Sequence, residues 1–198
     1  MDALEKYWGR AWQAKTEEEV VAEFKEFDIE AMLVALDLTT TIETPPCDND
    51  YVAGMRDRHD SIIQAWAAVE PALGQAAVDE ARHAINDLNM IGFHFHPIMQ
   101  HIRVDDKSFY PLWEELTQLK APVMIDVGMT GMGAGMPGGL GAKTRNAHPA
   151  SIDTLAADFP DLTIIMSHPG YPWIDETTAV ALHKGNVFWE MSGWSPKY

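Results

Sequence analysis

The chain has 198 residues and is strongly acidic, with 14 Lys and Arg against 30 Asp and Glu and a formal net charge of −16. Such a surface repels phosphate groups and anionic lipid, so we expect neither a nucleic-acid partner nor a membrane surface. The single cysteine, Cys47, cannot form an internal disulfide, and the sequence shows no secretory signal or long apolar run. We therefore expect a single domain over residues 1–198, located in the cytoplasm.

Six short apolar segments divide the chain. Each is a nearly continuous apolar run, which is typical of a parallel strand covered on both faces. The predicted strands are Ala31–Asp37, Ile62–Val69, Met90–His96, Val123–Val127, Leu162–His168 and Val187–Ser192.

Amphipathic segments of helical period lie between most of these strands. Thr16 and Glu19 have the spacing of a capping box and open a helix that precedes the first strand. Three further stripes follow at residues 78–88, 109–116 and 152–159. The alternation predicts an α/β fold with about six βα units, an incomplete (β/α)₈ TIM-barrel-like domain. The alternative is an open doubly wound parallel sheet, which needs no missing strands.

Polar or ionisable side chains end the predicted strands, and the carboxyl ends of parallel strands carry the chemistry in both folds. His94 and His96 are two residues apart on one strand and point to the same face. With Asp126 and His168 from neighbouring strands they form a candidate divalent-metal site, for Zn²⁺ first and Mn²⁺ or Fe²⁺ as alternatives. The alternative is that one of the pair is a hydrogen-bonded histidine and the other, such as His96, binds substrate. His168 is also the predicted catalytic acid or base.

A glycine-rich loop follows Asp126. It contains a GxGxxG pattern, but Pro137 lies inside it and no helix opens directly behind, so we do not expect dinucleotide binding. We expect a lid over the site instead. Lys143 and Arg145 are candidate partners for a substrate carboxylate, with solvated charges as the alternative, and Trp173 is a candidate substrate contact.

Several stretches resemble the amidohydrolase-related family 2 of the amidohydrolase superfamily, whose members are (β/α)₈ barrels that include metal-dependent hydrolases, hydratases and non-oxidative decarboxylases. The resemblance extends from about Thr16 to the C-terminus and implies that His168 matches a sixth-strand histidine of the metal site or of catalysis. It also implies that His96 matches the histidine of a Lys-x-His-Pro motif. The matching stretches are Gly92–Pro97, Phe109–Glu114, Ala121–Val123, Asp158–Gly170 and Asn186–Tyr198.

The sequence departs from the family pattern in three ways. The first-strand His-x-His pair and the last-strand Asp have no counterpart here, Asp126 stands where many relatives have a metal-binding His, and His94 stands where they have Lys. The expected function is a metal-dependent hydrolase of a small carboxylated or carbonyl-containing substrate, with an aromatic ring as one option. The alternatives are a non-oxidative decarboxylase or a catalytically inactive, oligomerising fragment. We also expect a homo-oligomer, because a sheet without its closing strands exposes edges and apolar faces.

Overall fold

The computed structural model describes residues 9, 13–42 and 45–193. Helices and strands alternate along most of this length. They are α2 (Glu17–Glu26), β1 (Ala31–Val34), α3 (Thr39–Ile42), α4 (Asn49–Arg58), β2 (Ile62–Trp66), α5 (Gln75–Asn86), β3 (Phe93–Phe95), α6 (Tyr110–Gln118), β4 (Val123–Asp126), α7 (Pro149–Asp158), β5 (Ile164–Ser167), α8 (Ile174–His183) and β6 (Val187–Trp189). Four 3-10 helices are added: η1 (Pro71–Leu73), η2 (Lys107–Phe109), η3 (Pro137–Gly141) and η4 (Thr144–Ala147).

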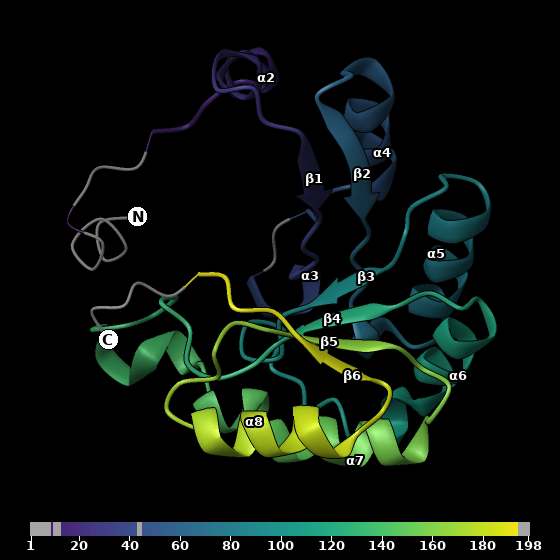
Figure 1. Cartoon of the computed structure of the whole chain (residues 1–198), viewed down its shortest axis with the longest axis vertical. Coiled ribbons are helices and arrows are strands. Elements are labelled where there is room, and N and C mark those ends of the chain that lie inside the picture. Colours follow the sequence, from purple (N-terminus) through teal and green to yellow (C-terminus); the bar gives the residue numbers. More distant parts are fainter. Residues whose placement is uncertain (1–8, 10–12, 43–44, 194–198) are drawn as a thin grey trace.

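The strands form two parallel sheets in chain order. β1 pairs with β2, and β3, β4, β5 and β6 form a second sheet in that order. A single bridge between Ala67 and Phe93 connects the two sheets in the described part of the chain, so the six strands follow one another along an interrupted arc (Figure 1).

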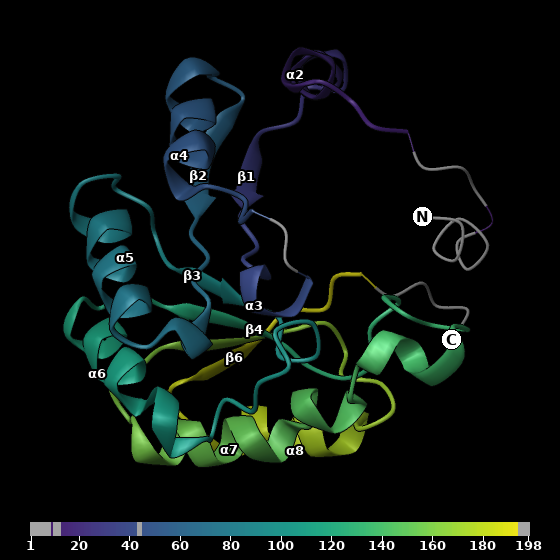
Figure 2. The same cartoon turned by 180° about the vertical axis from the view of Figure 1, so that it is seen from behind.

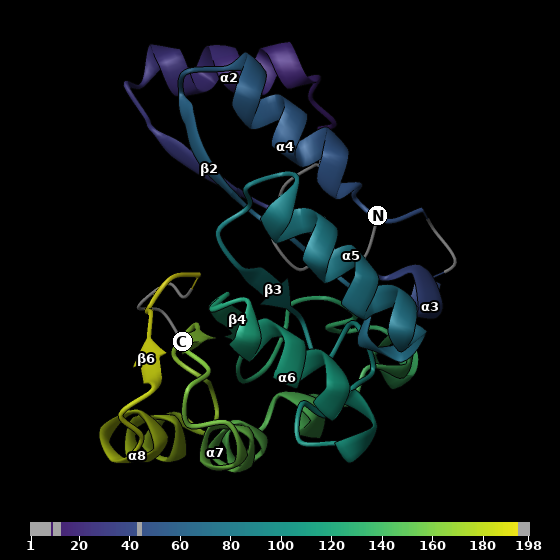
Figure 3. The ribbon, with the colours of Figure 1, turned by 90° about the vertical axis from the view of Figure 1, so that its right-hand side faces the viewer.

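The helices lie along one side of this arc. Figure 3 shows α4 to α8 succeeding one another beside the strands, and Figure 2 shows α5 to α8 in the same order from behind. A doubly wound sheet needs helices on both faces. The observed arrangement is instead that of an incomplete (β/α) barrel, as the sequence predicts.

The core lies between the longer sheet and its helices. Phe95 of β3 and Trp113 of α6 are fully buried and meet edge to face, with ring centroids 4.9 Å apart. The Trp113 Nε1–H donates to the Val104 carbonyl oxygen at 2.9 Å, so this buried indole has a partner for its polar atom. By contrast, Met32 and Val34 of edge strand β1 and Phe188 of edge strand β6 are exposed.

All six predicted strands are present, but each ends earlier than its apolar run does. Asp37, Glu70, His96 and His168 lie beyond the last residue of their strands. At these positions the backbone leaves the ladder: the His96 N–H, for example, donates to the side chain of Gln100 instead of to a neighbouring strand. Of the four candidate metal ligands, His96 and His168 therefore lie on loops that leave the sheet, whereas His94 and Asp126 lie on strands.

The predicted helices are also present, and the capping box is confirmed. The Glu19 N–H donates to Thr16 Oγ1, and the Thr16 N–H donates to the Glu19 carboxylate. Helices α4 and α8 and the short helix α3 are not among the predicted segments. Gly54 in α4 and the β-branched pair Thr177 and Thr178 in α8 lower the intrinsic helix propensity of these two helices, so tertiary packing stabilises both. Among the described residues, no helix has the length and apolar character needed to cross a bilayer.

Candidate active site

Three imidazoles converge on the carboxylate of Asp126. His94 Nε2 lies 3.1 Å from Asp126 Oδ1 and forms a hydrogen bond with it. His96 Nε2 lies 3.3 Å from Oδ2, and His168 Nε2 lies 3.7 Å from Oδ1. The structure thus brings together all four side chains that the sequence singles out as candidate metal ligands.

The register of the parallel strands explains this meeting. Asp126 is the last residue of β4 and pairs with Ser167, so His168 follows at the same edge of the sheet. His94 lies on β3, whose next residue, Phe95, pairs with Ile125 of β4. His96 is two residues beyond His94 and projects to the same face.

The hydrogen bonds determine which ring nitrogen carries the proton in two of these histidines. The Met99 N–H donates to His96 Nδ1 at 3.3 Å, so Nδ1 is an acceptor and the neutral ring carries its proton on Nε2. The bond between His94 Nε2 and the ionised Asp126 needs a donor on the imidazole, so His94 also carries a proton on Nε2. Its buried Nδ1 has no hydrogen-bond partner among the described residues.

His168 has the opposite tautomer. Its Nδ1 lies 2.9 Å from the Ser192 carbonyl oxygen, which only accepts, so Nδ1 carries the proton. The Nε2 lone pair of the neutral ring therefore faces Asp126. The His168 side chain is 32% exposed, which leaves it open to a small molecule. Its backbone φ is +73°, in the left-handed region that costs a non-glycine residue about 1 kcal/mol.

The charges of this cluster are set by competing effects. Burial alone would raise the pKa of Asp126, but the His94 hydrogen bond and the nearby imidazoles outweigh it, so the pKa lies below its usual value. Burial lowers the pKa of His96 despite the attraction of Asp126. Asp126 is therefore a carboxylate at neutral pH, and His96 is a neutral donor.

These tautomers bear on metal binding. Asp126 and His168 present lone pairs 3.7 Å apart, and two ligand atoms of one tetrahedral ion lie about 3.4 Å apart, so these two groups fit a divalent cation. His94 and His96 present N–H groups instead, which donate and do not coordinate. Within residues 9, 13–42 and 45–193, no group of three or more His, Cys, Asp or Glu side chains is arranged to hold a metal ion.

Gln100 connects this cluster to the ends of β1 and β2. Its Oε1 accepts from the His96 N–H, and its Nε2 donates to the carbonyl oxygens of Asp37 and Val69. Beside it, burial raises the pKa of Glu70 to about 7, and the charge of Asp37 adds to this effect. Gln100 is almost fully buried, and it holds the ends of three strands together. Sequence analysis missed it because nothing marks a buried glutamine in a turn.

The remaining predicted site residues lie on loops after β4 and β5. Lys143 and Arg145 are exposed at η4 and form no ion pair within the described part of the chain. Trp173 packs against His148, with ring centroids 4.6 Å apart and ring planes tilted by 51°, and precedes α8. Within the described part of the chain, none of the three forms a hydrogen bond or an ion pair with the Asp126 cluster. Trp194, in the last of the stretches that resemble the family, lies outside the described residues.

The glycine-rich loop begins with a close backbone approach. The φ of Gly128 is +89°, and a Cβ there would lie 2.5 Å from the carbonyl carbon of Gly170 in the loop after β5. The Met129 N–H also donates to the Tyr171 carbonyl oxygen at 2.7 Å. Gly128 therefore lets the loops after β4 and β5 meet next to Asp126 and His168. The lid role of the rest of the loop stays a prediction.

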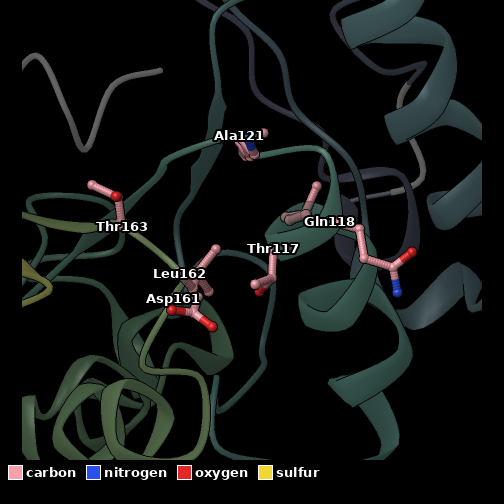
Figure 4. A pocket seen from close by; sticks show the side chains of 8 residues that line it. Thr117, Gln118, Ala121, Asp161, Leu162 and Thr163 are labelled. Atoms are coloured by element: carbon pink, nitrogen blue, oxygen red, sulfur yellow. The ribbon is translucent and has the colours of Figure 1, made fainter.

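The pocket shown in Figure 4 is separate from this cluster. It lies between the end of α6 and the segments that lead into β4 and β5, and its lining includes Thr117, Gln118, Asp161 and Thr163. These residues are at the amino ends of the strands, whereas the His and Asp cluster is at the carboxyl ends. In barrels of this class the chemistry occurs at the carboxyl ends, so we assign no catalytic role to this pocket.

Comparison with known proteins agrees with the fold. The family model described as Amidohydrolase matches residues 13–198. The chain therefore belongs to the amidohydrolase family. A search of curated proteins found no match.

Solved structures show the same fold. An uncharacterized TIM-barrel protein from Bordetella bronchiseptica has 23% sequence identity and a TM-score of 0.68, with 88% of this chain and 58% of that chain covered. The 2,6-dihydroxybenzoate decarboxylase from Rhizobium has 17% identity and a TM-score of 0.58, with coverages of 79% and 57%. The 5-carboxyvanillate decarboxylase from Novosphingobium aromaticivorans, solved with bound manganese, has 16% identity and a TM-score of 0.61, with coverages of 92% and 56%. The chain thus spans slightly more than half the length of these proteins.

Proposed function

We propose that Asp126 and His168 form the active site of a metal-dependent enzyme that acts on a small carboxylated or carbonyl-containing substrate. The observation that supports this proposal most directly is the meeting of three imidazoles around one buried carboxylate at the carboxyl ends of β3, β4 and β5. Buried groups with perturbed pKa values at such an edge are typical of catalytic sites.

Asp126 and His168 would hold the divalent metal ion, because they are the two groups with lone pairs directed at each other. His94 would donate its Nε2–H to the ligating carboxylate, and His96 would place a neutral N–H beside it. Such outer partners orient a ligand and tune its basicity. When bound, the ion polarises a carbonyl group or lowers the pKa of a water molecule. Imidazole with carboxylate suits zinc or manganese, and the manganese of the 5-carboxyvanillate decarboxylase supports the second.

His168 Nε2 has a single lone pair, so His168 would either bind the ion or move a proton, and not do both at once. In the second role Asp126 would hold the ion without His168, the Nδ1–H is held by the Ser192 carbonyl oxygen, and Nε2 accepts a proton and later returns it. The carboxylate of Asp126, 3.7 Å from Nε2, stabilises the imidazolium that forms in between. Lys143 and Arg145, exposed cations on the loop after β4, remain our proposed partners for a substrate carboxylate, and Trp173 a proposed contact for its ring.

Hydrolysis and decarboxylation both fit these roles. Hydrolysis needs an activated water and a proton donor for the leaving group. Non-oxidative decarboxylation needs a proton delivered to the carbon that loses carbon dioxide. The structural similarity to two decarboxylases of hydroxylated benzoates favours decarboxylation as the second candidate. We further propose a cytoplasmic location, since the single cysteine fits a reducing compartment, and self-association, which light scattering would measure.

The test compares His168→Gln with a matched control, His83→Gln. His83 also contacts two carboxylates, Asp87 and Asp50, but it lies on the exposed face of α5. The purified chain, supplied with Zn²⁺ or Mn²⁺, would be assayed for carbon dioxide release from hydroxybenzoates and for hydrolysis of small esters, lactones and amides.

We expect His168→Gln to lower the measured rate by about 100-fold or more, and His83→Gln to leave it unchanged. Metal analysis and thermal unfolding with and without added Mn²⁺ provide an independent readout of metal binding. No turnover on either panel, together with no metal retained and no shift in melting temperature, would refute the proposal in favour of an inactive module.

A further inference from the structure

The segment that ends β6 surrounds His168 with hydrogen bonds. The Trp189 Nε1–H donates to the His168 carbonyl oxygen at 2.7 Å. The His168 N–H donates to Glu190 Oε1 at 2.9 Å. The Ser192 carbonyl oxygen lies 2.9 Å from Nδ1 of the ring. The backbone N–H, the ring Nδ1 and the backbone carbonyl oxygen of His168 thus all have hydrogen-bond partners within residues 189–192.

These contacts replace the partners that a strand would supply. β5 ends at Ser167, and the φ of His168 is +73°, so its peptide groups have left the ladder. The indole of Trp189 and the carboxylate of Glu190 satisfy those two peptide groups with side-chain atoms. The left-handed backbone of His168 therefore depends on two side chains from β6 and the residue after it.

The same segment also determines the ring tautomer. Glu190 Oε2 accepts the Ser192 N–H at 2.9 Å and so holds the residue whose carbonyl accepts the His168 Nδ1–H. Glu190 Oε1 lies 3.9 Å from Nδ1, where its negative charge favours a proton on that nitrogen. Gly193 packs on the ring: a Cβ at that position would lie 2.6 Å from Nδ1.

We propose that Trp189 and Glu190 are positioning residues that keep His168 in the Nδ1–H tautomer, with the Nε2 lone pair facing Asp126. This inference rests on the proposed function only in one respect: the proposed function gives His168 Nε2 its chemical role. Glu190 also accepts the Ser192 Oγ–H. If Glu190 served only to cap this loop, its loss would change the stability of the protein and leave the His168 tautomer unchanged.

The experiment measures the tautomer directly. Protein labelled with ¹⁵N in its histidines is examined by two-bond ¹H–¹⁵N correlation NMR at about pH 8, where a histidine of ordinary pKa is neutral. The His168 signals are assigned by their loss in His168→Gln. In the unsubstituted chain we expect a protonated Nδ1 and an unprotonated Nε2.

Two variants and their controls are then compared. Trp189→Phe removes the donor to the His168 carbonyl oxygen, and Glu190→Gln leaves one acceptor oxygen in place of two. Asp106→Asn is the matched control for Glu190, because Asp106 accepts from the N–H and Oγ–H of Ser108 in the same way, in the loop before α6. Trp113→Phe is the matched control for Trp189, because its indole also donates to a backbone carbonyl oxygen.

We expect both test variants to lose the single-tautomer pattern and show a mixture that includes Nε2–H, while both controls keep it. An unchanged His168 pattern in folded Trp189→Phe and Glu190→Gln would overturn the proposal. A fixed tautomer in a protein that binds no metal and turns over no substrate would instead leave the positioning role standing and refute the proposed function. The two failures are thus distinguishable.

Discussion

Two carboxylates, one in each half of the molecule, each contact three other side chains. Glu17, at the start of α2, contacts Arg58, His59 and Tyr51 beside the β1–β2 sheet. Asp126 contacts His94, His96 and His168 in the β3–β6 sheet. Their side chains are almost equally covered, 15% and 13% exposed, and both have a lowered pKa.

What covers the two carboxylates differs. Glu17 is covered mainly by its own partners, and Arg58 and Tyr51 are themselves half-exposed on the surface. Asp126 lies between buried strands, and one of its three neighbours, His168, keeps an open lone pair directed at it. Three partners around a carboxylate therefore do not define a site. We propose that burial among strands, together with one accessible nitrogen that has a free lone pair, distinguishes the site instead.

The largest expected effect comes from Asp126→Ala. It removes the acceptor of the buried His94 Nε2–H, so we expect the free energy of unfolding to fall by about 3 kcal/mol. It also removes a proposed metal ligand, so the rate on any substrate found should fall by about 100-fold or more. Urea unfolding and steady-state assays measure the two effects. Glu17→Ala, the equivalent change in the other half, should leave the rate unchanged, and an equal loss of rate in both variants would contradict the distinction.

The next effect is a pH dependence from Glu70. Its pKa rises from an ordinary 4.5 to about 7 on folding, so the folded state binds more protons than the unfolded state between these values. The contribution of Glu70 to the free energy of unfolding is therefore fully present below pH 4.5 and is lost as the pH rises through about 7, by about 3 kcal/mol in total. Urea unfolding of Glu70→Gln across this range should lack that decline, whereas Glu114→Gln, an exposed carboxyl on α6, should retain it. A decline of the same size in Glu70→Gln would contradict the assignment.

The smallest effect is expected from the Glu17 cluster in acid. The Arg58 hydrogen bond, followed by that of His59, lowers the pKa of Glu17 from 4.5 to about 2. Its contribution to stability is therefore present above pH 4.5 and is lost as pH falls through about 2. Since Arg58 and Tyr51 are half-exposed, we expect Glu17→Gln to lower the urea midpoint slightly at pH 7 and not at all near pH 2. High salt should reduce the difference, and a midpoint insensitive to Glu17→Gln at every pH would show that the cluster contributes nothing.

The sequence by itself determined the order of strands and helices and the edge at which the candidate site residues meet. Continuous apolar runs identify parallel strands because both of their faces are buried, and Asp126 and His168 were found because each follows such a run. The capping box of α2 is equally local, since its residues are three apart.

Only the tertiary structure decided what each site residue does. The proton positions on His96 and His168 depend on the Met99 N–H and on the Ser192 carbonyl oxygen, the second of these 24 residues away along the chain. The roles of Gln100 and Glu190 likewise depend on atoms of other strands. Hydrophobic periodicity records which face of a segment is buried, whereas a hydrogen bond depends on the distance and direction between atoms that folding alone brings together.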